Sequence, residues 1–91
     1  MRLKWSEYAS YQYREQIDYI ALRNAYAAEN IEESIEKALS NILAFPRIGR
    51  VGRYPDTFEY AVKNASLIIV YEIQEENITV LNILHMSQDY P

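Results

Sequence analysis

The sequence predicts an α+β fold, in which an N-terminal strand and an antiparallel helix hairpin pack on a curved antiparallel sheet. Three observations carry this prediction. Two helical patterns fill the first half of the chain and β-branched runs fill the second. A loop rich in proline, glycine and arginine, residues 45–62, separates the two halves. The predicted order of elements is therefore β-α-α-β-β-β.

Chain length and composition limit the function classes. The 91 residues predict a single domain, 1–91, which buries only about 60–65% of its unfolded surface and could gain stability from a partner. The chain has no cysteine and no run of about 18 apolar residues, and its N-terminus does not read as a signal peptide. We therefore expect a soluble, cytoplasmic protein without membrane association. A net charge of −4 argues against a general nucleic-acid binder.

The first strand and helix follow from local pattern. Residues 2–5 alternate polar and apolar, which predicts a strand with Leu3 and Trp5 facing inward. Ser6 is a plausible N-cap, and the helix should end near Arg23 or Asn24. Its apolar positions recur at helical spacing: Ala9, Tyr13, Ile17, Ile20 and Ala21. Further tyrosines on its flanks either fill a small core or form a surface that a partner covers, namely Tyr8, Tyr11 and Tyr19.

The second helix has a clearer apolar stripe, made of Ile31, Ile35, Ala38, Leu39, Ile42 and Leu43. Pro46 stops this helix. Because few residues separate the two helices, they should form an antiparallel hairpin.

The loop that follows combines turn formers with cations. Pro46, Gly49, Gly52 and Pro55 are expected to force it into turns. These turns would present three arginines, Arg47, Arg50 and Arg53, which together with Lys63 form a basic patch on an acidic body. Such a patch suits one focused anionic contact or target better than a long duplex. The alternative is that these cations only solvate the loop.

The second half predicts an antiparallel meander. Residues 57–62 form the first strand, and residues 63–66 form a turn. The β-branched run 67–73 is expected to be a central strand with both faces covered. A polar turn at 74–77 leads to the last strand, 78–85.

Signals for catalysis are sparse. The sequence has no glycine-rich phosphate loop, no serine-centred elbow and no metal-ligand spacing, so no cofactor and no metal are predicted. The one histidine, His85, ends the last strand. It is either structural or a general acid/base, in which case Arg53 or Arg50 would stabilise a phosphate in the transition state.

Five segments, in this order, give the chain a family resemblance. They are Trp5-Ser6, the run from Phe45 to Arg50, the run from Tyr54 to Val62, Ile68-Ile69-Val70-Tyr71, and the tail from His85 to Pro91. Together they resemble the RelE/ParE toxin superfamily of type II toxin–antitoxin modules, and the ParE branch most closely. The resemblance implies a toxin that inhibits DNA gyrase by binding and that a cognate antitoxin neutralises in a hetero-oligomer. If a partner covers the tyrosines of the helix hairpin, we expect Tyr8, Tyr11 and Tyr19 to contact the antitoxin or another partner.

The resemblance leaves two alternatives open. One is a ribosome-dependent endoribonuclease that cleaves mRNA, with His85, Arg53 and Tyr90 as catalytic residues. It is disfavoured because such relatives carry an arginine where Ile68 stands, and an apolar group cannot neutralise a scissile phosphate. The other is a relative that binds only its antitoxin, since ParE-like sequences often carry an arginine at the position of Phe58.

Overall fold

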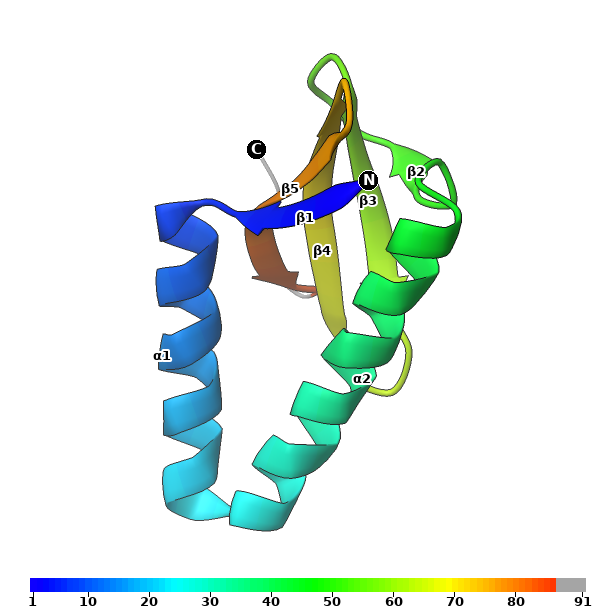
Figure 1. Cartoon of the computed structure of the whole chain (residues 1–91). Coiled ribbons are helices and arrows are strands. Elements are labelled where there is room, and N and C mark those ends of the chain that lie inside the picture. The colour runs from blue at the N-terminus through cyan, green and yellow to red at the C-terminus, as the bar shows by residue number, and fades with distance from the viewer. Residues whose placement is uncertain (87–91) are drawn as a thin grey trace.

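A five-stranded sheet and two helices make up the chain in our computed structural model, which describes residues 1–86. The helices are α1 (Glu7–Arg23) and α2 (Ala25–Ala44), and the strands are β1 (Arg2–Trp5), β2 (Arg50–Val51), β3 (Thr57–Val62), β4 (Leu67–Gln74) and β5 (Asn77–His85). The strand order across the sheet is β1-β5-β4-β3-β2. Figure 1 shows α1 beside β5 and β1, and α2 on the side of β3 and β4.

This architecture confirms the predicted helix hairpin packed on a sheet, and two details go beyond the prediction. The two-residue strand β2 lies inside the predicted loop and pairs with β3. The N-terminal strand β1 pairs with β5 in parallel, with Trp5 opposite Val80, whereas the prediction had only antiparallel pairs. Parallel neighbours require a long crossover, and here the two helices and the whole meander supply it.

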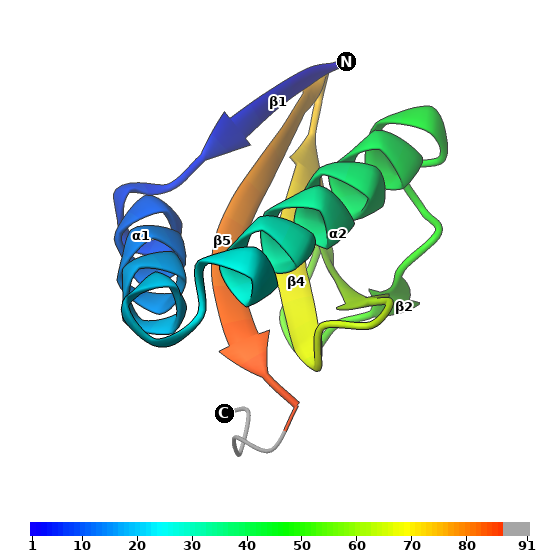
Figure 2. The same ribbon diagram turned by 90° about the horizontal axis from the view of Figure 1, so that it is seen from below.

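Capping side chains define the ends of both helices. The Ser6 hydroxyl accepts a hydrogen bond from the Ala9 backbone N–H at 3.0 Å, as predicted for an N-cap. Asn24 alone links the helices: its N–H donates to the Ile20 carbonyl, and its Oδ1 accepts from the Ala27 N–H at 3.0 Å. Figure 2 shows the two helices from below. Neither helix has the length and apolar content to cross a bilayer, as judged over residues 1–86.

The core lies between the helices and one face of the sheet. From α2 it receives Ile35, Ala38 and Ile42, and from the sheet it receives mainly Phe58, Val62, Leu67, Ile69, Tyr71, Ile78, Val80 and Ile83. Two positions of the predicted stripes are wrong, because Ala21 and Leu43 are exposed. Each stands at the margin of its stripe, where the helix surface turns away from the sheet.

Side chains of α1 cover the edge of β5 beyond the end of β1. Gln12 Oε1 accepts a hydrogen bond from the Ile83 N–H at 3.0 Å, and Gln16 Nε2 donates to the Ile83 carbonyl at 3.2 Å. The two glutamines thus replace a neighbouring strand at that residue and protect an otherwise open edge. This helix buries only Ala9 fully, so most of its outer surface is left to solvent.

A β-bulge changes which residues of β5 face the core. Val70 pairs with Asn82, but the next residue, Tyr71, pairs with Val80, so Leu81 is the extra residue. The buried positions therefore shift from Ile78 and Val80 to Ile83. The bulge keeps apolar side chains on the core face from Ile78 to Ile83.

Candidate functional site

The sheet core anchors the loop between α2 and β3, residues 45–56, which we call the arginine loop. The Tyr71 hydroxyl, from the middle strand, donates to the Pro46 carbonyl at 2.7 Å and accepts from the Gly49 N–H at 3.1 Å. Tyr71 is fully buried, and burial raises its pKa, although the hydrogen bond from Gly49 opposes part of that shift. One core side chain therefore fixes the first half of the loop.

The two glycines of the arginine loop serve close packing rather than a left-handed turn. Neither adopts a positive φ. The turns predicted for this loop form at Pro46–Arg47 and Pro55–Asp56, and Gly49 lies in a bend. A Cβ at Gly49 would lie 2.8 Å from Tyr71 Oη and 2.9 Å from the Glu59 carbonyl oxygen. A Cβ at Gly52 would overlap Thr57 Oγ1. Both positions require glycine because the loop lies directly against β3 and Tyr71.

Two of the three loop arginines pack against β3. The Arg47 guanidinium lies over the Phe58 ring, 5.7 Å from its centroid. Arg50 Nη2 lies 3.3 Å from Glu59 Oε1, while 83% of the Arg50 side chain stays exposed. Arg53 is also exposed and precedes the turn in which the Thr57 hydroxyl donates to the Tyr54 carbonyl. The arginine loop therefore presents all three guanidinium groups to solvent while β3 positions two of them.

Large apolar side chains alternate with these arginines on the outside of the loop. Their exposed fractions are high: Phe45 67%, Ile48 45%, Val51 76% and Tyr54 55%. Phe45, Pro46, Arg47 and Ile48 also line an open groove of about 830 Å³, whose other wall includes Ile73 and Glu75. Aromatic and arginine side chains on a fixed backbone are the residue types that dominate protein–protein binding energy.

The structure separates two other predicted site residues, Lys63 and His85, from the arginine loop. Lys63 follows the far end of β3, about 13 Å along the strand from the Arg50–Glu59 pair. His85 pairs with Leu67, whereas Arg53 adjoins the opposite end of the sheet, where Thr57 pairs with Glu72. These two sheet ends are about 17 Å apart along β4. Tyr90 lies outside the described residues.

The sheet face that points away from the helices offers little for phosphate chemistry. A hollow of about 390 Å³ on β3 and β4 is lined by Glu59, Ala61 and Ile68, among others. Of the described residues that line it, Arg50 carries the positive charge, and Glu59 pairs with it. Within residues 1–86, no group of three or more His, Cys, Asp or Glu residues could hold a metal ion.

The predicted tyrosines form one outward stripe along α1. Tyr8, Tyr11 and Tyr19 are 58–62% exposed, and Leu22, which the sequence reading did not include, is 88% exposed. Spacings of three, eight and three residues place all four on one side of the helix. We call these four residues the tyrosine stripe. The Arg23 guanidinium lies 4.4 Å from the Tyr19 ring centroid at its end.

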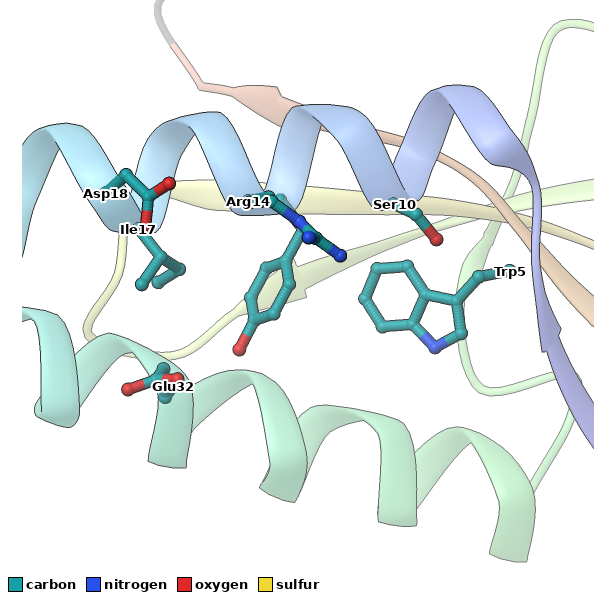
Figure 3. A pocket seen from close by; sticks show the side chains of 7 residues that line it. Trp5, Ser10, Arg14, Ile17, Asp18 and Glu32 are labelled. Carbon is teal, nitrogen blue, oxygen red and sulfur yellow. The ribbon is translucent and has the colours of Figure 1, made fainter.

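A cleft that the sequence did not predict lies between the two helices, and Figure 3 shows it from close by. Its volume is about 440 Å³, and its lining combines Trp5, Tyr13 and Ile17 with polar residues, among them Arg14 and Glu32. The Trp5 and Tyr13 rings are 5.3 Å apart, and burial followed by the charges of Glu32 and Glu36 raises the pKa of Tyr13. Periodicity assigns these side chains to the core; only the packing shows that the helices diverge enough to leave them accessible.

Comparisons with known proteins match nearly the whole chain. The family model described as the ParE toxin of the type II toxin–antitoxin system, parDE, matches residues 3–90. A protein of Sinorhizobium fredii (strain NBRC 101917 / NGR234), named "Putative toxin Y4kP", is 28% identical over 90 residues. That match covers 99% of this chain and 93% of the relative.

Solved structures share the fold at low sequence identity. The chromosomal ParDE system of P. aeruginosa superposes with a TM-score of 0.79 at 17% identity, covering 93% of this chain and 95% of that one. The intact E. coli RelBE complex gives 0.72 at 19%, covering 96% and 98%, and the isolated E. coli RelE toxin gives 0.71 at 18%, covering 97% and 86%. These superpositions confirm the predicted RelE/ParE-like fold.

Proposed function

The chain belongs to the family of ParE toxins of type II toxin–antitoxin systems, and we propose that it acts by binding DNA gyrase through the arginine loop, without chemistry of its own. A cognate antitoxin would neutralise it in a cytoplasmic hetero-oligomer. The family match does not choose between gyrase and the ribosome, so this proposal depends on the geometry of the site.

One observation carries the proposal: the arginine loop has the composition and rigidity of an interface centre. It exposes Arg47, Arg50 and Arg53 between large apolar side chains, and Tyr71 holds its backbone in place. A preformed loop loses little conformational entropy on binding, so more of its contact energy appears as affinity. Arginines presented in this way suit an acidic surface on the target.

The antitoxin would occupy a different surface. Of the solved structures with this fold, one is described as a chromosomal ParDE system and another as the intact RelBE toxin–antitoxin complex. In this chain the tyrosine stripe and the cleft between α1 and α2 offer exposed aromatic area and an apolar recess. An antitoxin segment that folds on binding could cover both, with apolar side chains entering beside Trp5 and Tyr13.

The endoribonuclease reading has less support from the same geometry. General acid/base catalysis requires the proton donor and the phosphate-stabilising cation to reach the same phosphodiester. His85 and Arg53 lie at opposite ends of the sheet, and Ile68 occupies the hollow of the helix-free face. Inhibition by binding requires no such convergence.

Two assays with the purified chain separate the readings. Supercoiling by purified gyrase should fall as the chain is added, and gyrase-linked DNA breaks should accumulate, whereas mRNA in a cell-free translation reaction should stay intact. Cleavage of ribosome-bound message with normal supercoiling would instead establish the endoribonuclease. If neither assay responds and expression without antitoxin does not arrest growth, the chain is the relative that only binds antitoxin.

A further inference from the structure

A small polar pocket lies between α2 and the end of β3, away from the arginine loop. Its volume is about 250 Å³. Three parts of the chain line it: α2, β3 and the turn after β3, through Ser34, Lys37, Ala38, Asn41, Tyr60, Lys63 and Asn64. More of its lining is polar than apolar, unlike the helix cleft and the groove beside Phe45.

Among residues 1–86, the charged side chains that line this pocket are both positive. Lys37 comes from α2 and Lys63 from the turn, and none of the lining residues in that range is a carboxylate. Within residues 1–86 neither lysine forms an ion pair, since the ion pair found there joins Arg50 to Glu59. In a chain of net charge −4, two unneutralised ammonium groups at one pocket produce a local positive potential.

Neutral donors complete the lining. Asn41 Nδ2 donates to the Tyr60 hydroxyl at 3.1 Å, so the hydroxyl proton of Tyr60 remains available to a ligand. Ser34 on α2 adds a hydroxyl, and Asn64 in the turn after β3 adds an amide. Asn64 has a φ of 67°, which holds the turn in a left-handed conformation that asparagine tolerates.

We propose that this pocket binds a phosphate group. Two ammonium groups balance the charge of a phosphate, which is about −1.5 to −2 near neutral pH. A tetrahedral oxyanion accepts hydrogen bonds from several directions, and the donors of this pocket come from three parts of the chain. A planar carboxylate is better matched by the planar guanidinium group of an arginine. The group could belong to free inorganic phosphate or to a nucleoside monophosphate. The proposal does not depend on the proposed binding of gyrase, because no residue of the arginine loop lines this pocket.

An NMR titration of the full-length, ¹⁵N-labelled chain tests the site with two probes, inorganic phosphate and AMP, at constant ionic strength. Adenosine and chloride serve as reference ligands. We expect saturable shifts of the Asn41 and Asn64 side-chain amides with both phosphate-bearing probes. Lys37→Gln or Lys63→Gln should each weaken binding about tenfold, because each removes one charge-assisted hydrogen bond.

Lys4→Gln is the matched control, since Lys4 is the remaining lysine and is exposed on β1. It should change the affinity less than about twofold, because exposed charges at a distance are screened. Tighter binding of AMP than of phosphate would assign the nucleotide as the source, and equal or weaker binding would assign the free anion. Unsaturable shifts, or equal affinity in Lys4→Gln and Lys63→Gln, would overturn the proposal. Unchanged amide spectra away from the pocket would verify that each variant is folded.

Discussion

Replacing Tyr71 by Phe removes the two hydrogen bonds that hold the arginine loop while keeping the ring in the core. The substitution removes the hydroxyl oxygen that lies 3.1 Å from the Gly49 nitrogen and 2.7 Å from the Pro46 carbonyl oxygen. Both backbone groups then lose this hydrogen-bond partner. At about 1 kcal/mol for each bond, unfolding should be easier by about 2 kcal/mol, which lowers Tm by roughly 8–16 °C in a domain of this size.

Thermal unfolding followed by circular dichroism measures this cost, and Tyr60→Phe is the matched control. The Tyr60 hydroxyl takes part in an exposed hydrogen bond with Asn41, so its loss should cost less than about 0.5 kcal/mol. If the two variants melted together, Tyr71 would not be the anchor of the arginine loop. Amide hydrogen exchange adds a local readout, because the Gly49 N–H should lose protection in the Tyr71→Phe variant alone.

Three further predictions concern the core and the loop. Ile42→Ala should cost about 2–4 kcal/mol because Ile42 is fully buried, whereas Leu43→Ala, at an exposed position, should cost under about 1; equal costs in urea denaturation would show that the helix phase is wrong. Gly49→Ala should lower Tm because its Cβ would lie 2.9 Å from the Glu59 carbonyl oxygen, and an unchanged melt would refute that close approach. Because burial raises the pKa of Tyr71, the folded state favours the neutral phenol. The stability that this tyrosine contributes is therefore complete below pH 10 and is lost as pH rises through its folded-state pKa. When the free energy of unfolding is measured against pH, the Tyr71→Phe variant should show a shallower decline at alkaline pH.

Hydrophobic periodicity was sufficient for the helices and strands but not for their margins. The stripe through Ile35, Ala38 and Ile42 faces the sheet as predicted, because a pattern that is consistent over several turns fixes the phase of a helix. Ala21 and Leu43 fit the spacing equally well, yet both are exposed. Burial at a margin depends on where the neighbouring element ends, which a local pattern does not encode.

Features that depend on contacts between distant segments could not be predicted. The bulge at Leu81 moves the core-facing positions of β5 from even to odd residue numbers. The sequence of β5 has isoleucine, valine or leucine at both even and odd positions, so its pattern does not reveal the change. Gly49 looks like a turn glycine until Tyr71 is placed against it. Likewise, the sequence contains His85 and Arg53, but only the strand pairing shows that they stand at opposite ends of the sheet.

The affinity of the purified chain for purified gyrase, compared between wild type and the Arg50→Ala/Arg53→Ala variant, tests the central claim most directly. Both side chains are exposed, so the variant should fold, and its affinity should fall at least about tenfold if the arginine loop is the centre of the interface. Arg2→Ala, which removes an exposed arginine from β1, should bind as the wild type does. Equal affinity in all three proteins, or no binding by any, would contradict the account.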